Sequence, residues 1–121
     1  MFQSRKKTQA QQDRSDKIHA GECLACAQLR DELGLVGEDR KCCGPVEEHH
    51  TDGRTKPWAH DVTTSLGSYH HRRVPLPGRT GAEMLAEFGP SLLHGSKIFA
   101  ARFGNSRDLL SRQDAILRGE A

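Results

Sequence analysis

The sequence predicts a small α+β domain, and three observations support this class. A Cys-x-x-Cys turn precedes a short helical stretch near residue 24. Two short extended segments then flank a loop rich in Gly, Thr and Pro. The last third of the chain reads as helices with capping residues. At 121 residues the chain has the length of one domain.

The first segment, residues 1–17, has almost no large apolar side chains and carries five basic residues: Arg5, Lys6, Lys7, Arg14 and Lys17. Such a segment cannot offset its ordering entropy by burial. We expect it to be a flexible basic arm. It precedes a core at residues 18–78 and packing helices at residues 79–121.

The core begins with the Cys-x-x-Cys turn and a helix whose Leu29, Leu33 and Leu35 share one face. "PVEEHH" (45–50) and "DVTTSL" (61–66) are the two strand candidates. "GSYHHRR" (67–73) then begins a helix, with Ser68 as its cap, and "VPLPG" ends it. Two strands and a helix around one point make a compact ββα arrangement.

The tail contains three helical stretches, each preceded by a residue that can cap it: Thr80, Ser91 and Ser106. Apolar side chains recur on one face of the first two stretches: Met84, Leu85, Phe88, Leu92, Phe99 and Phe103. We expect these helices to pack on the core.

Composition indicates that the core needs extra stabilisation, since apolar residues make up 35% of the chain and aromatic residues 5%. The start of the chain lacks the apolar stretch of a secretory signal, and no segment is apolar enough to span a membrane. We therefore expect a cytoplasmic protein with reduced thiols, which favours metal ligation over disulfides. The net charge of +2 does not by itself indicate nucleic acid binding.

The cysteines have the spacing of a zinc site. Cys23-x-x-Cys26 lets two sulfurs reach one tetrahedral ion. The remaining ligands would come from Cys42 or Cys43 and from one histidine of the pair at 70 and 71. Two alternatives stay open: buried cysteines without a ligand, and an accessory subunit stapled by two disulfides.

Five of the seven histidines lie between residues 49 and 71, as a pair, a single and a pair. Neutral imidazole binds divalent metals, and its pKa near neutrality suits a general base that activates water. Such a cluster meets the needs of metal-assisted phosphodiester cleavage. The alternative is a second structural zinc.

Basic residues flank the histidines and could contact DNA phosphates, which position a duplex without reading its sequence: Arg54, Lys56, Arg72 and Arg73. Trp58 lies in the loop between the strand candidates. We expect its indole to cover the small core.

The order of these motifs resembles a known family. "CLAC", "VEEHHTDGRT", His60 and "SLGSYHH" are similar to the treble-clef (ββα-metal) HNH endonucleases. They are most similar to the phage recombination-enhancement (Ref-type) nucleases, which cut DNA in partnership with RecA filaments. The resemblance covers roughly residues 21–117. It implies a DNA endonuclease, with DNA and a RecA-type recombinase filament as partners, in the cytoplasm of a bacterial host and without a membrane.

The resemblance also implies the ligands of a structural zinc. Cys23 and Cys26 would bind it on the knuckle, and His70 would be a third ligand. Where the family has the cysteine of Leu-Cys-x-x-His-His, this chain has Gly67, which has no side chain to ligate. We expect Cys43 or Cys42 to supply the missing thiolate.

Four further histidines would form the catalytic centre that the resemblance implies. His49 and His71 would hold a catalytic Mg²⁺ or Mn²⁺ ion, and His50 would be the general base. His60 would take the middle position, which in the family steadies the loop or touches the metal. The competing interpretation is a zinc-stabilised DNA- or protein-binding module without catalysis.

Overall fold

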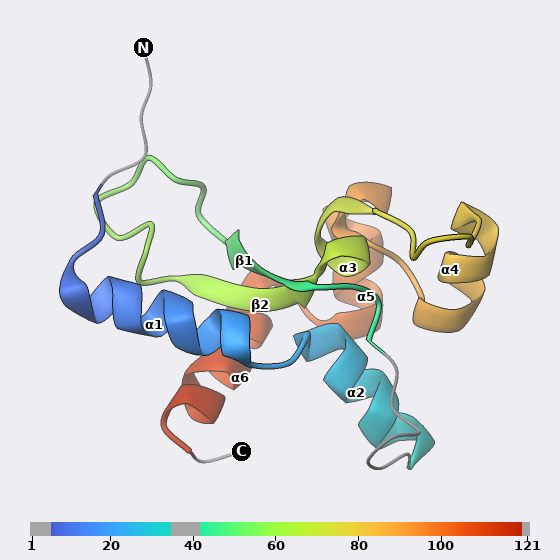
Figure 1. Cartoon of the computed structure of the whole chain (residues 1–121), viewed down its shortest axis with the longest axis horizontal. Helices are drawn as coiled ribbons and strands as arrows, with labels where there is room; N and C mark the ends of the chain where they lie inside the picture. Colours follow the sequence, from blue (N-terminus) through green and yellow to red (C-terminus); the bar gives the residue numbers. More distant parts are fainter. Residues whose placement is uncertain (1–5, 35–41, 120–121) are drawn as a thin grey trace.

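The computed structural model describes residues 6–34 and 42–119. A two-stranded antiparallel sheet runs through the molecule with helices on either side of it (Figure 1). The elements, in chain order, are α1 (Gln9–Ala20), α2 (Leu24–Leu33), β1 (Val46–His50), β2 (Thr63–Gly67), α3 (Ser68–Arg72), α4 (Gly81–Phe88), the 3-10 helix η2 (Leu92–His94), α5 (Ser96–Phe103) and α6 (Ser106–Leu117). This confirms the small α+β class.

The sheet pairs the two segments that the sequence predicts to be extended. In its register Val46 faces Gly67 and His50 faces Thr63. The strands are joined by the loop 51–62, and Thr51 closes that loop because its amide and hydroxyl both donate to the carbonyl of Val62. The loop therefore begins and ends at the same edge of the sheet.

Helix α3 follows β2 without a linker and lies against β1 as well. Its N-cap is Gly67 and no side chain caps it, so Ser68 is the first helical residue and not the predicted cap. The helix ends at Arg72, and its C-cap Arg73 adopts the left-handed backbone conformation (φ 60°). The order strand, loop, strand and helix is the expected ββα order.

The expectation of a flexible arm over residues 1–17 is wrong for residues 9–17, which belong to α1. A capping box between Thr8 and Gln11 starts the helix. Arg14 donates to the hydroxyl (3.1 Å) and carbonyl (2.7 Å) oxygens of Thr63 and pairs with Asp114. Polar contacts therefore help to hold this helix on the sheet, and the scarcity of apolar residues in the segment did not predict them.

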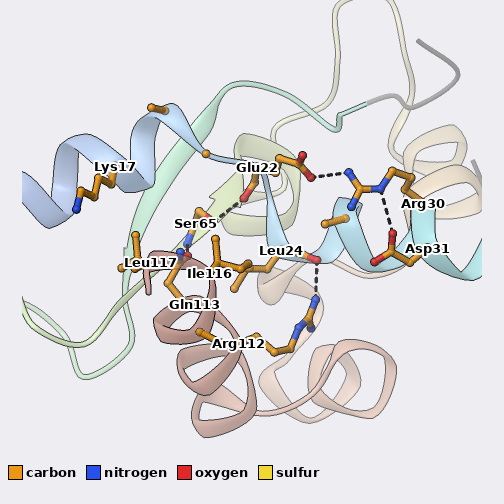
Figure 2. A pocket seen from close by; sticks show the side chains of 14 residues that line it. Lys17, Glu22, Leu24, Arg30, Asp31, Ser65, Arg112, Gln113, Ile116 and Leu117 are labelled. Atoms are coloured by element: carbon orange, nitrogen blue, oxygen red, sulfur yellow. Dashed lines mark hydrogen bonds and ion pairs between the residues drawn. The ribbon is translucent and has the colours of Figure 1, made fainter. Parts of the chain in front are cut away.

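Helix α6 packs against β2, and side chains of α6 also reach β2 and the start of α2 (Figure 2). The amide oxygen of Gln113 accepts a hydrogen bond from the backbone of Ser65, and Arg112 donates to the carbonyl of Leu24. A hollow of about 710 Å³ lies between these elements and the end of α1. None of the predicted catalytic or metal-binding residues line it.

The tail forms the predicted helices with two shifts at their starts. Thr80 caps α4 as predicted. Ser91 caps the short η2 instead of α5, because the non-helical backbone of Gly95 separates the two helices. Asn105, and not Ser106, caps α6.

The buried core includes Met84, Phe88, Phe99 and Phe103 as expected. Leu85 and Leu33 are exposed instead, and Leu35 lies outside the described residues. In the part of the chain that the structure describes, no helix is long and apolar enough to cross a membrane.

Candidate metal and catalytic centre

Four predicted zinc ligands meet in the core. The sulfurs of Cys23, Cys26 and Cys43 and a ring nitrogen of His70 lie within 4.8 Å of one another, and all four residues are buried. The start of α2, the segment before β1 and helix α3 supply them. The donor set fits a tetrahedral zinc ion, for which Cys₃His is a common structural set.

The ring of His70 is oriented as a metal ligand requires. Its Nε2 lies 2.8 Å from the carbonyl oxygen of Phe88, which only accepts, so Nε2 carries the proton. Its Nδ1 lies 3.1–3.6 Å from the sulfurs of Cys23, Cys26 and Cys43. The lone pair of Nδ1 therefore faces the three sulfurs, and the carbonyl fixes the tautomer.

Without a cation, ionisation of one thiol of the cluster disfavours ionisation of its neighbours. Burial opposes ionisation of Cys23, but hydrogen bonds from Cys26, Cys43 and His70 lower its pKa well below the usual value. The adjacent Cys23 sulfur, in turn, is the largest cause that raises the pKa of Cys26 and of Cys43. A divalent cation would offset this repulsion between thiolates.

The structure brings Cys43, and not Cys42, into the cluster. Cys42 is partly exposed and its thiol donates to the carbonyl of Gly44. A Cβ atom built on Gly67 would lie 2.5 Å from the sulfur of Cys43. The Cys43 sulfur thus occupies the space that a side chain at position 67 would take.

The four other histidines between residues 49 and 71 form two pairs. His50 Nε2 lies 3.1 Å from His60 Nδ1, with the ring centroids 5.2 Å apart. Within the described residues, the buried Nδ1 of His50 has no hydrogen-bond partner. Burial is the main cause that lowers the pKa of His50, which favours the neutral ring. Loop 51–62 brings His60 back beside His50.

The second pair is His49 and His71, whose ring centroids lie 5.1 Å apart. Burial, with smaller contributions from His71 and His50, lowers the pKa of His49 to about 4. The carboxylate of Glu47 binds His71 Nδ1 at 2.9 Å and also binds Arg72. The Arg72 guanidinium lowers the pKa of Glu47 below its usual value. Sequence reasoning missed Glu47, although strand alternation places residues 47 and 49 on one face.

A hollow of about 230 Å³ adjoins His49 and is lined also by the first residues of α5 and α6, including Lys97. Two imidazoles are fewer ligands than a closed structural site has. Among residues 6–34 and 42–119, Cys23, Cys26, Cys43 and His70 form the one set of three or more ligand-type side chains close enough to share an ion. The His49–His71 pair would leave coordination positions open, as a catalytic ion requires.

The predicted phosphate contacts differ in their surroundings. Arg54, Lys56 and Arg73 are exposed, whereas Arg72 is paired with Glu47. Trp58 is 47% exposed and its indole donates to Asp52, so the expectation that it covers the core is wrong. The ring is held at the loop surface instead.

A buried Cys₃His cluster that could hold a metal ion, with a neighbouring group of histidines, characterises this small α+β protein. The model of the family described as "Recombination enhancement, RecA-dependent nuclease" matches residues 7–118 of this chain. The chain therefore belongs to this family, which confirms the resemblance to the Ref-type nucleases. The match includes α1, which the sequence had suggested to be an arm. A comparison with curated proteins found no match.

Proposed function

We propose that this protein is a metal-dependent HNH endonuclease that hydrolyses DNA phosphodiester bonds in recombination, on a treble-clef, ββα-metal core. The observation that carries the proposal is the position of His49, His50, His60 and His71. All four lie at β1, its loop and α3, in a nuclease family, beside a cluster suited to zinc.

The Cys₃His cluster would have a structural role. Cys23, Cys26, Cys43 and His70 would hold a zinc ion with all four positions filled, which leaves none for a substrate. Its ligands come from three separate segments, so the ion would tie α2, the chain before β1 and α3 together. Zinc coordination by these segments would keep His71 on α3 facing His49 on β1.

His50 would act as the general base. Its Nε2 lies 3.1 Å from Nδ1 of His60, and this contact would orient the ring. When the His50 imidazole takes a proton from water, the oxygen of that water would form a bond to phosphorus. The bond from phosphorus to the 3′ oxygen then breaks, and the leaving oxygen is protonated by solvent.

His49 and His71 would hold the catalytic Mg²⁺ or Mn²⁺ ion in this proposal. When bound there, a divalent cation offsets the negative charge that develops on the leaving oxygen. The neutral state of His49 at pH 7 suits this role, because its lone pair is available to a metal.

The DNA backbone would pass over the hollow beside His49. Arg54 and Lys56 of loop 51–62 and Arg73 at the end of α3 are exposed cations, and Lys97 lines the hollow itself. Such contacts hold a duplex in register through its phosphates and carry no base information. A RecA-type filament would present the DNA, as the name of the family suggests.

The test is a plasmid nicking assay with Mg²⁺ or Mn²⁺, in the presence and absence of recombinase filaments. We expect His50→Ala to reduce the nicking rate by roughly 100-fold or more, the usual loss when a general base is removed. Zinc content and melting temperature should stay at the wild-type values. His19→Ala, which removes an exposed imidazole of α1, is the matched control and should cut normally.

Equal nicking by wild type and His50→Ala would refute the assignment of the base. A second function, a zinc-stabilised DNA-binding module without catalysis, is favoured if wild type binds DNA and zinc but does not nick under any of these conditions. The Cys₃His cluster supports that alternative equally well, since it needs no catalytic ion.

A further inference from the structure

Glu47 contacts His71, one of the proposed ligands of the catalytic ion. Because successive side chains of a strand point to opposite faces, Glu47 and His49 share a face of β1. Helix α3 packs against β1 and brings His71 and Arg72 to the same face. Glu47 therefore contacts two consecutive residues of α3.

The contact with His71 determines where the ring proton lies. His71 Nδ1 is 2.9 Å from Glu47 Oε1, and an ionised carboxylate only accepts hydrogen bonds. Nδ1 must therefore carry the proton. In a neutral imidazole the other nitrogen, Nε2, is then left with the lone pair that a metal needs.

Arg72 holds the carboxylate in place. Its Nε donates to Glu47 Oε1 at 2.7 Å, and its Nη2 donates to Oε2. A two-point guanidinium contact of this kind fixes both the plane and the direction of a carboxylate. The Glu47 side chain is 24% exposed and the Arg72 side chain is 57% exposed, so this ion pair lies at the edge of the protein surface.

We propose that Glu47 is a positioning residue that fixes His71 in the Nδ1–H tautomer, so that Nε2 is the nitrogen offered to the ion shared with His49. The inference rests on the proposed function, since it assigns a partner to one of the proposed ligands. It also gives Arg72 a different role from the phosphate contact that the sequence suggested: the guanidinium holds Glu47. An outer carboxylate of this type both orients a ligating imidazole and raises its basicity.

The experiment compares four variants of the full-length, zinc-loaded chain. Glu47→Ala removes the acceptor, and Glu47→Gln keeps an acceptor oxygen but loses the charge. Arg72→Ala removes the brace and leaves Glu47 beside His71. The matched control is Glu87→Ala, which deletes a carboxylate paired with Arg79 at 2.6 Å on α4, in another element from the histidines.

Two measurements that do not depend on DNA cleavage test the role of Glu47. Nitrogen-15 NMR of the imidazoles reports which nitrogen of His71 carries the proton, and calorimetry reports Mn²⁺ affinity. Wild type should show the Nδ1–H tautomer. Glu47→Ala should lose this tautomer preference and bind Mn²⁺ about 10- to 100-fold more weakly, the usual effect of deleting such a partner. Glu47→Gln should keep the Nδ1–H tautomer and lose less Mn²⁺ affinity than Glu47→Ala. The Mn²⁺ affinity of Arg72→Ala should lie between those of Glu47→Gln and wild type. Glu87→Ala should match wild type in both measurements.

Persistence of the Nδ1–H tautomer in Glu47→Ala would overturn the inference, and so would unchanged Mn²⁺ affinity after the tautomer is lost. Failure of the proposed function looks different. In that case wild type itself would neither bind Mn²⁺ nor nick DNA, while its His71 would still show the tautomer that Glu47 imposes.

Discussion

At the scale of single residues, Cys43 and Gly67 depend on each other. A Cβ at position 67 would come 2.5 Å from the Cys43 sulfur, closer than real Cβ contacts, and 3.1 Å from the carbonyl of Gly44. The glycine is needed here for space and not for an unusual backbone, because its φ is −65°. A thiol from outside the ββα segment reaches the cluster only while position 67 has no side chain.

We predict that Cys43→Ser releases zinc and lowers the melting temperature, whereas Cys42→Ser leaves both unchanged. The first substitution removes one of the four atoms that face a common point, and the second removes a thiol that binds the carbonyl of Gly44. Zinc content by atomic absorption and thermal unfolding by circular dichroism measure the two effects. Wild-type zinc content in both variants and in the double variant would show that neither cysteine replaces the missing ligand.

Gly67→Ala should also weaken zinc binding, although it alters no ligand. The methyl group would displace the Cys43 sulfur, and buried crowding of this kind typically costs about 1–3 kcal/mol. Zinc release to a colorimetric chelator, compared with Gly81→Ala at an uncrowded glycine, measures the effect. If Gly67→Ala retained zinc as tightly as Gly81→Ala, the sulfur would not depend on that space.

At the scale of elements, side-chain polar contacts join α1 to the sheet, in addition to the burial of Ile18. Arg14 joins α1 to β2 and α6, while Ser15 donates to the buried carboxylate of Glu48 at 2.7 Å. Glu48 and His50 lie on the same face of β1, so α1 covers the strand that carries the proposed base. The family match also includes this helix, since it begins at residue 7.

Arg14→Lys should therefore destabilise the protein although it keeps the charge. A lysine cannot reproduce the forked contact with the hydroxyl and carbonyl of Thr63, and hydrogen bonds to charged groups contribute about 1.5–3 kcal/mol. Urea unfolding followed by circular dichroism gives the change in the free energy of unfolding. Lys17→Ala, on the exposed side of the same helix, is the control and should stay within about 0.5 kcal/mol of wild type. Equal stability of Arg14→Lys and wild type would mean that apolar packing alone holds α1.

At the scale of the whole molecule, the candidate zinc site lies within the apolar core and not beside it. Cys23, Cys26 and Cys43 belong to the same buried cluster as Tyr69 and Phe103, and the ring of His70 lies 5.1 Å from that of Phe103. A chain with 35% apolar residues has a limited core of its own. Metal binding and folding should accordingly be coupled.

Chelation of zinc should thus loosen the entire fold and not only one end of it. Binding to the folded state alone stabilises it by about 4 kcal/mol when the free ion is at 1,000 times its dissociation constant. We expect a chelator to lower the melting temperature and to broaden amide signals from α2, β1 and α3 together in NMR spectra. Signal loss confined to the Cys23–Cys26 turn would contradict this coupling.

Much of the architecture was predictable from local patterns. β1, β2 and α3 appear in the predicted order because β-branched and turn residues have local preferences. The boundaries of α5 and α6 were less certain, since Gly95 and Asn105 compete with nearby serines as caps. Helix α1 was missed because its stability comes from residues about 50 positions away, such as Thr63.

By itself, the sequence determined the chemistry available to this protein: a Cys-x-x-Cys knuckle, two histidine pairs and their order along the chain. Spacing within a turn or a strand is local, so it follows from covalent geometry and periodicity. Only the tertiary structure decided that Cys43 and not Cys42 joins Cys26 and His70, and that Glu47 binds His71. These contacts join segments that lie 17–44 residues apart. Which atoms meet at such separations depends on how β1, β2 and α3 pack, and no local pattern encodes that.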